Sequence, residues 1–158
     1  MRNEEMQRLD VLVGTWRTTL KNAWFLEPAD LEVPGEATVE WLHDAFLVFR
    51  WTMRGDVGDA TSEMVMVLGR SDARDTYTAL YHDERGVCRD FAMTFDGSRW
   101  TLTREDPDMF QRYVADVRPD QISGAWEASE DRGATWRKDF DLVLDRTWTG
   151  RRAHRVAL

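Results

Sequence analysis

The sequence contains one cysteine and no long apolar run. Cys88 alone cannot form an internal disulfide, and it is too little for a multi-cysteine zinc site. No apolar stretch approaches the roughly 18 residues of a membrane-spanning helix, and the opening residues MRNE do not begin a signal peptide. These absences predict a cytoplasmic protein in a reducing compartment.

Positive charge is also scarce. Twenty-nine acidic residues outnumber 21 basic ones, giving a formal net charge of -8. Nucleic acids and anionic membranes attract clustered Lys and Arg, so we expect neither among the partners. Only Lys21 and Lys138 of the basic residues are lysines, a bias that a GC-rich bacterial genome would explain.

Large aromatic side chains, in contrast, are plentiful. Eight Trp and seven Phe occur in 158 residues, a length that suffices for one core without covalent staples. Because each of these side chains needs extensive contact area, their number favours a β-rich core or an aromatic-lined pocket.

A short N-terminal helix is predicted first. Asn3 can cap it, apolar residues recur at helical spacing as far as Val13, and Gly14 is expected to end it. One apolar stripe on such a helix has to be covered. We therefore expect it to pack across one end of the fold.

Ten alternating segments follow, most of them bounded by turn residues. They run over about 16–20, 36–43, 45–54, 61–70, 76–82, 87–96, 99–104, 109–118, 121–128 and 135–145. Nearly all the links are short, which forces antiparallel neighbours, and closing the sheet removes its two exposed edges. The prediction is an all-β, ten-stranded, antiparallel up-and-down barrel over residues 1–146, with a basic C-terminal tail at 147–158. A two-sheet sandwich is the main alternative, but it would need long crossovers.

The hairpin over residues 120–146 is the clearest part of this pattern. Its second run places apolar residues on one face and charged residues on the other. The apolar set predicted to face the interior is Trp136, Phe140, Leu142 and Leu144. This hairpin should form the closing seam of the barrel.

The sequence resembles the lipocalins and their calycin relatives. Gly14-Thr15-Trp16 after a short helix is similar to their Gly-X-Trp opening, and YHDERGVCRDFAMTFDGSRW is similar to an uncharacterised bacterial lipocalin-like family. The resemblance covers roughly residues 5–146 and implies a calycin barrel without implying an activity. It further implies that Arg146 covers Trp16 at the closed end, in a structural role.

Nitrobindin and the fatty-acid-binding barrels are more distant resemblances. The nitrobindin opening carries two further glycines, where this sequence has residues 17–19 as Arg-Thr-Thr. No histidine occurs between Trp136 and Arg146, so this resemblance carries no haem ligand in the last strand. Haem remains an alternative cofactor, with His82 as the first candidate ligand and His43 as the second. No spacing in the sequence indicates a metal site.

Several residues are candidates for binding a ligand. Arg89, Arg104 and Arg112 alternate with apolar residues and are expected inside the barrel, with Tyr81 and Tyr113 as further donors. His82, which follows Tyr81 at the end of a strand, is also a candidate ligand contact. Each arginine either pairs with a carboxylate or extends its head outward, or one or two of them anchor an anion at the bottom of a pocket.

The long first connection, residues 21–35, is expected to act as a lid. Its Trp24 and Phe25 are candidate ligand contacts, because connections of about fifteen residues are often binding loops. The leading hypothesis is a carrier or sensor of a small hydrophobic or aromatic molecule with an acidic group, acting as a monomer or homodimer. The alternatives are an isomerase, lyase or hydrolase using the same cavity, or a haem-binding barrel. No nucleophile motif or phosphate-binding loop supports catalysis.

Overall fold

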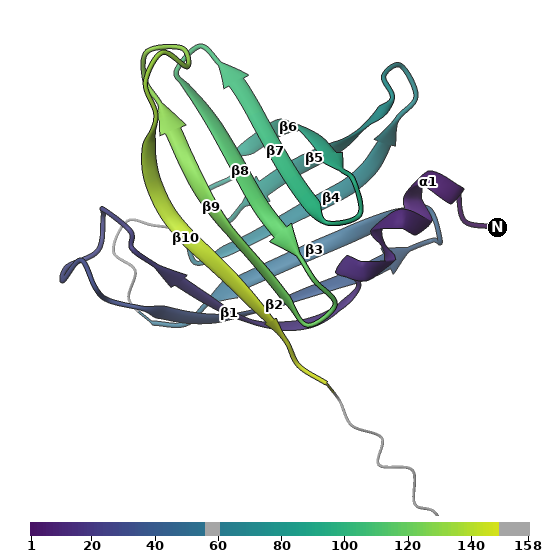
Figure 1. Ribbon diagram of the computed structural model, residues 1–158, viewed down its shortest axis with the longest axis horizontal. Helices are drawn as coiled ribbons and strands as arrows, with labels where there is room; N and C mark the ends of the chain where they lie inside the picture. The colour runs from purple at the N-terminus through teal and green to yellow at the C-terminus, as the bar shows by residue number, and fades with distance from the viewer. Residues whose placement is uncertain (56–60, 149–158) are drawn as a thin grey trace, which may run out of the picture.

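The fold is a closed barrel of ten antiparallel strands, in which each strand pairs with the next in sequence and β10 pairs with β1 (Figure 1). It was obtained as a computed structural model that describes residues 1–55 and 61–148. The strands are β1 Gly14–Lys21, β2 Val33–Leu42, β3 Phe46–Met53, β4 Glu63–Ser71, β5 Thr76–Asp83, β6 Cys88–Phe95, β7 Arg99–Asp106, β8 Met109–Val117, β9 Gln121–Ser129 and β10 Arg137–Arg146. The predicted fold class is confirmed.

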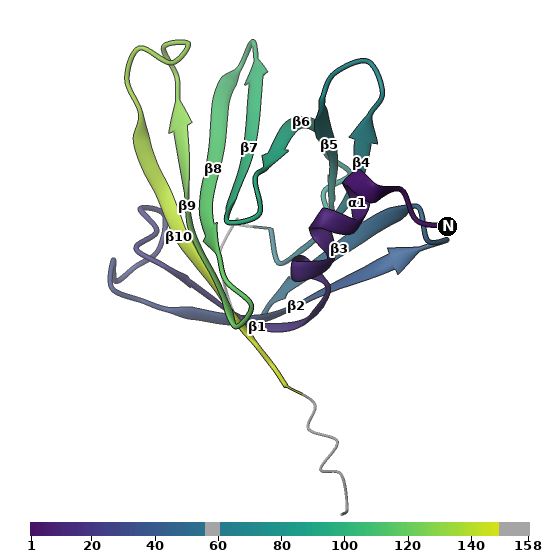
Figure 2. The ribbon, with the colours of Figure 1, turned by 45° about the vertical axis from the view of Figure 1, so that its right-hand side comes forward.

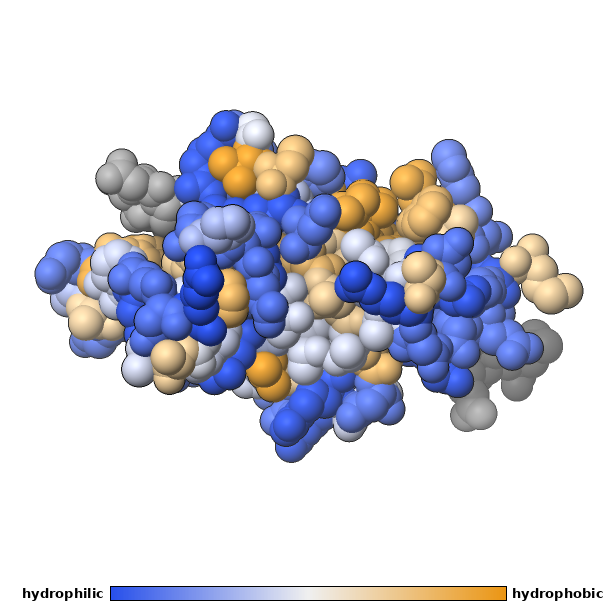
Figure 3. All heavy atoms as spheres, turned by 90° about the horizontal axis from the view of Figure 1, so that it is seen from above, coloured by the Kyte–Doolittle hydropathy of each residue, from blue (hydrophilic) through white to orange (hydrophobic). Residues whose placement is uncertain are grey.

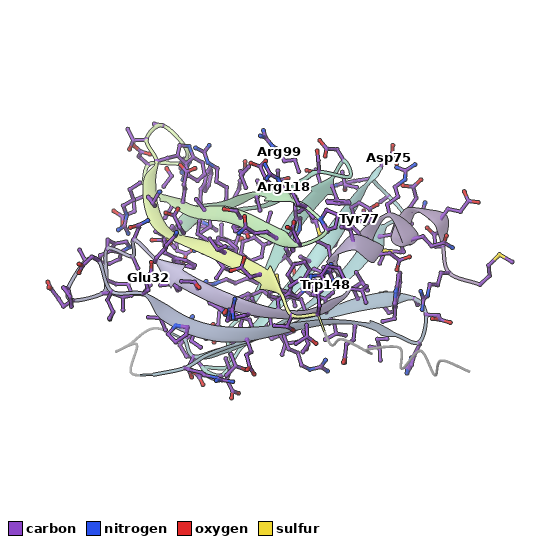
Figure 4. The ribbon with its side chains drawn as sticks, turned by 60° about the horizontal axis from the view of Figure 1, so that its bottom comes forward. Glu32, Asp75, Tyr77, Arg99, Arg118 and Trp148 are labelled. Carbon is purple, nitrogen blue, oxygen red and sulfur yellow. The ribbon has the colours of Figure 1, made fainter. Side chains whose placement is uncertain are left out.

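The loop between β1 and β2 is shorter than predicted, because both strands extend further into it. It covers residues 22–32, and Pro34 and Gly35 belong to β2. A side chain at Gly35 would overlap the Thr18 hydroxyl and the Thr52 carbonyl, so this strand position requires glycine. The loop lies at the end of the barrel opposite the β4–β5 turn, as Glu32 and Asp75 show in Figure 4.

The N-terminal helix covers one end of the barrel, which we call the closed end (Figure 2). It consists of α1, Glu4–Gln7, continued by the 3₁₀ helix Arg8–Leu12. The Asn3 side chain accepts a hydrogen bond from the Glu5 N–H at 2.9 Å, as expected of a cap. Tyr77 of β5 donates to the Glu5 carbonyl at 2.7 Å and ties the helix to the barrel wall (Figure 4).

Gly14 has a different role from the one predicted. The 3₁₀ helix ends at Leu12, and Gly14 begins β1 with a φ of 145°. A Cβ at this position would overlap the guanidinium of Arg146. The glycine therefore makes room for that arginine at the closed end.

Arg146 connects several parts of the closed end. It lies opposite Trp16 in the β1–β10 register, with its guanidinium 4.0 Å from the indole centroid. Its Nε donates to the Pro119 carbonyl at 2.5 Å, and its two Nη atoms donate to Val13 and Val11 carbonyls at 2.6 Å each. One side chain thus joins the helix, the β8–β9 turn and both strands of the seam.

The start of β10 departs from simple alternation. Lys138 pairs with Glu127 and Phe140 pairs with Trp126, so Asp139 is an extra residue in a β-bulge. Because one inserted residue reverses which face each preceding side chain points to, the prediction that Trp136 faces the interior is wrong. Trp136 instead lies on the outer side, while Phe140, Leu142 and Leu144 keep the expected face.

Within the described ranges, no helix is long and apolar enough to cross a membrane. Thr147 extends the seam by donating its N–H to the Thr15 carbonyl at 2.9 Å, and Trp148 is exposed. The remainder of the predicted basic tail, residues 149–158, lies outside the described residues.

Candidate functional site

A pocket of about 640 Å³ is lined by residues of the β1–β2 loop and of the nearby strand ends, at the end of the barrel that we call the open end. The N-terminal helix lies at the other end (Figure 2). On the face seen from above, hydrophilic residues are widespread and hydrophobic side chains show between them (Figure 3). The pocket-lining residues are Leu20, Trp24, Phe25, Trp51, Met53, Thr61, Met64, Tyr81, Arg85, Arg89, Phe91, Met109, Gln111, Trp126, Arg137, Asp139 and Phe140. This volume lies within the range of roughly 300–1,000 Å³ that small-molecule sites occupy.

Aromatic rings form much of the pocket wall. Phe140 lies between Trp51 and Trp126, with both centroid distances at 6.4 Å. Phe91 meets Trp126 edge to face at 5.5 Å, and Phe25 of the loop meets Phe140 in the same way at 6.0 Å. Flat, polarisable walls of this kind suit an apolar or aromatic ligand.

The lid residue Trp24 is tethered across the mouth of the pocket. Its indole N–H donates to Asp139 Oδ1 at 2.8 Å, and the Arg137 guanidinium lies 4.6 Å from its ring centroid. Both partners face the pocket because of the bulge in β10. Trp24 is nevertheless 60% exposed, so its apolar surface is presented to solvent at the entrance.

A hydrogen-bonded group of three residues lies at the end of β5. Arg85 donates to the fully buried Asp83 carboxylate at 2.6 Å, and the Tyr81 hydroxyl donates to the same carboxylate at 2.8 Å. The Arg85 hydrogen bond is the main reason that the pKa of Asp83 is held well below its usual range. Burial, followed by the Asp83 hydrogen bond, raises the pKa of Tyr81 to about 12. Tyr81 is therefore a protonated donor already committed to Asp83.

Arg89 lines one side of the pocket, where β6 and β7 separate, and the nearby Arg104 does not belong to the lining. The register between these strands runs only from Ala92↔Thr103 to Phe95↔Trp100, whereas both arginines lie nearer the open end. Arg104 is buried and pairs with Asp106 at 2.6 Å and Asp108 at 3.3 Å. Both arginines also approach the Gln111 side chain of β8.

Arg89 has weaker partners than its neighbour. Its Nη1 is 3.5 Å from the Gln111 oxygen, and its guanidinium lies 5.5 Å from the Tyr81 ring centroid. No carboxylate in the described part of the chain forms an ion pair with it. Arg89 thus brings into the pocket wall a positive charge that no described residue neutralises.

Two predicted site residues point away from the pocket. Arg112 lies on the outer surface, where it pairs with Glu127 at 3.0 Å and covers Trp136 at 4.0 Å. His82 is also exposed on the outside, with Nδ1 3.2 Å from Cys88 Sγ. His82 follows the inward-facing Tyr81, and Arg112 precedes the inward-facing Tyr113. Because adjacent strand residues point to opposite faces, both His82 and Arg112 point outward. The prediction that Arg112 lies inside the barrel is therefore wrong.

Tyr113 faces inward but lies within the packed interior. It is fully buried and stacks on Trp126 at 5.1 Å, and it is absent from the pocket lining. Its hydroxyl has no hydrogen-bond partner among the described residues, and burial raises its pKa. The expected anion anchor at the bottom of the pocket is also misplaced. The bottom is occupied by rings such as this one, and the arginines lie along the wall near the open end.

No histidine belongs to the pocket lining as described. His82 lies outside the barrel and His43 is exposed in the β2–β3 turn, so neither is placed to ligate a haem in this pocket. His154 lies outside the described residues. Across residues 1–55 and 61–148, no cluster of His, Cys, Asp and Glu is arranged to hold a metal ion.

Comparison with known proteins supports the architecture. No protein-family model matches the chain, and no curated protein matches it significantly. The chain is similar to a solved structure described as the crystal structure of Rv2717c from M. tuberculosis, with a TM-score of 0.67 and 14% identity over 94% of this chain and 100% of that one. A fluorescence-activating β-barrel designed de novo has a TM-score of 0.46 and 13% identity over 87% and 95% of the two chains. The first similarity shows the fold alone, and the second is too low to carry an argument.

Sequence reasoning missed Gln111, Arg137 and Asp139. An amide in an alternating strand gives no signal until its face is known. Arg137 and Asp139 face the mouth of the pocket only because of the bulge in β10, and no residue pattern in the sequence indicates that bulge.

Proposed function

We propose that the protein binds a small hydrophobic or aromatic molecule that carries an acidic group, and that it acts as a carrier or sensor within a calycin-like barrel. The observation that carries this proposal is the coincidence of an aromatic-lined pocket with Arg89 in its wall. The rings supply apolar contact area, and the guanidinium supplies the charge that an acid requires.

The charge at the pocket mouth supports an acidic ligand. Although the chain has a net charge of -8, the described residues that line the pocket include three arginines and one aspartate, Asp139. Arg85 is bound to the buried Asp83, and Arg137 is shared with Trp24 and Glu130. Arg89 is the cation that remains for a ligand among the residues described.

The loop residues support capture of an apolar body. Trp24 lies at the entrance and Phe25 contacts Phe140 in the wall, so a ligand that enters would meet aromatic surface on several sides. Trp24 is held at this position by its indole hydrogen bond to Asp139, by a backbone hydrogen bond to the Asp139 carbonyl at 3.4 Å and by Arg137.

No comparable observation favours the enzyme or the haem-binding barrel. The Tyr81 hydroxyl donates to Asp83 and has a raised pKa, which suits neither a general base nor a nucleophile near neutral pH. The two described histidines, His43 and His82, lie away from the pocket.

Tryptophan fluorescence provides the test, since Trp24, Trp51 and Trp126 line the pocket. The panel consists of 1-naphthaleneacetic acid and dodecanoic acid, each with its neutral amide or alcohol. We expect saturable quenching by the acids, with dissociation constants in the micromolar range, on the order of -8 kcal/mol. Absence of binding by every compound, acidic or neutral, would refute the proposal.

A further inference from the structure

Gln111 is the centre of a polar subsite in the pocket wall. It lies on β8, lines the pocket and is only 8% exposed. Its side-chain oxygen accepts from Arg104 Nε at 3.1 Å and is approached by Arg89 Nη1 at 3.5 Å. Two guanidinium groups thus converge on one neutral oxygen.

This convergence fixes which way the Gln111 amide points. A carboxamide oxygen has two lone pairs, and here Arg104 and Arg89 direct their N–H groups at them. The flipped orientation would place the NH₂ group against two cations, which cannot accept a hydrogen bond. The NH₂ group therefore faces away from both arginines, and no acceptor for it occurs among the residues of the described ranges.

The subsite consists of donors. Arg104 uses Nη1 for Asp106 and Asp108, but its buried Nη2 has no partner within the described chain. Arg89 has no described carboxylate partner, and Gln111 adds two N–H donors. Arg89 and Gln111 belong to the pocket lining, so a ligand group rich in acceptors could receive hydrogen bonds from both.

We infer that the Gln111 amide and the Arg89 guanidinium together bind a carboxylate on the ligand, with Arg104 as a positioning residue that holds the amide in its orientation. This inference rests on the proposed function and names the acidic group that the pocket selects. A carboxylate suits the pair because its two oxygens lie in one plane and can accept from two adjacent planar donors. Although Gln111 carries no charge, it then determines the preference of the pocket for a carboxylate.

The substitution Gln111→Glu separates this inference from general electrostatics. The new side chain has the same shape and would accept hydrogen bonds from both arginines, so we expect an unchanged or higher melting temperature. It removes the amide donors and places a negative charge where the ligand carboxylate should lie. The affinity for 1-naphthaleneacetic acid should fall about tenfold or more, while that for 1-naphthaleneacetamide should stay within roughly threefold.

Thr103→Glu is the matched control. Thr103 is exposed on the outer face of the neighbouring strand β7, so this variant adds the same charge outside the pocket. It should leave the affinities for both compounds unchanged. A similar loss of acid binding in the Thr103 and Gln111 variants would mean that net charge is responsible and would overturn the inference.

A measurement on the unmutated protein removes any dependence on folding of the variants. The Gln111 side-chain NH₂ resonances should shift on addition of 1-naphthaleneacetic acid, and should shift much less with the amide. Undiminished acid binding by Gln111→Glu, or unmoved NH₂ resonances, would overturn the inference. If Arg89→Met still abolished the acid preference in that case, the proposed function would stand. If neither compound bound the unmutated protein, both proposals would fail.

Discussion

The two ends of the barrel place an arginine against an aromatic ring in opposite ways. At the closed end, Arg146 lies 4.0 Å from the Trp16 centroid and donates to three backbone carbonyls. At the open end, Arg89 lies 5.5 Å from the Tyr81 centroid and approaches one neutral oxygen, that of Gln111. The first arginine has three of its five N–H donors bound to backbone carbonyls, whereas the second has one long contact to a neutral oxygen and keeps donors for a ligand.

The same contrast extends to the apolar side chains. Near the closed end, Leu9, Leu12 and Trp16 are fully buried and the interior is filled. Near the open end, Trp51 and Phe140 belong to a wall that encloses about 640 Å³. Stability should therefore depend mainly on the closed end and ligand binding mainly on the open end, and substitutions at each end can test this division.

The largest effect is expected for Trp16→Ala. The indole is fully buried beneath Arg146, so its removal leaves a cavity that the surrounding strands cannot fill. We expect the free energy of unfolding to fall by about 3–5 kcal/mol, measured by urea denaturation. The corresponding change at the other end, Trp24→Ala, should cost little stability because that side chain is exposed. Equal losses in the free energy of unfolding for Trp16→Ala and Trp24→Ala would show that stability does not depend mainly on the closed end.

Arg146→Ala should be the next most damaging change. It removes three charge-assisted hydrogen bonds and leaves the carbonyls of Val11, Val13 and Pro119 without that donor. The expected loss is about 2–3 kcal/mol in the free energy of unfolding, with a lower melting temperature and unchanged ligand affinity. An unchanged melting temperature would show that Arg146 does not close the barrel.

Arg89→Met should produce the reverse pattern. Affinity for 1-naphthaleneacetic acid should fall about tenfold, equivalent to roughly 1.4 kcal/mol, because the pocket loses its available charge. The melting temperature should hardly change, since no described carboxylate loses an ion-pair partner. Arg112→Met on the outer surface is the control and should keep the affinity. A binding loss of equal size in both variants would contradict the assignment of Arg89 to the ligand.

The smallest effect concerns the β9–β10 loop at low pH. Hydrogen bonds from the Thr135 side chain and backbone, followed by the Ser129 hydroxyl, lower the pKa of Asp131 to about 2. Because the folded pKa lies below the ordinary value of 3.8, the loop is stabilised above about pH 4. That stabilisation should be lost as the pH falls toward 2. The Thr135 amide resonance should report this transition, and Asp131→Asn should lack it.

The barrel itself was predictable from residue patterns. Alternation with short turns gave ten strands, and Gly14-Thr15-Trp16 with Arg146 indicated how β1 meets β10. These features are local or involve chemically distinctive pairs. The predicted start of β2 was late because Pro34 and Gly35 looked like loop residues, although both belong to that strand.

The facing of individual side chains was less predictable. Strand β8 carries apolar residues on both faces, so the sequence does not tell whether Arg112 or Tyr113 points inward. The bulge at Asp139 reversed Trp136 because one inserted residue changes the register without changing the composition. The role of Gln111 follows only from the structure, in which β6, β7 and β8 bring Arg89 and Arg104 to its side-chain oxygen.

A crystal structure of the protein with 1-naphthaleneacetic acid would show whether the open end of the barrel binds the acid through Arg89 and Gln111. We expect the naphthalene ring to lie among Trp51, Trp126 and Phe140, with its carboxylate within hydrogen-bonding distance of Arg89 and the Gln111 NH₂ group. A ligand bound only on the outer surface would contradict it. So would a carboxylate directed away from both side chains.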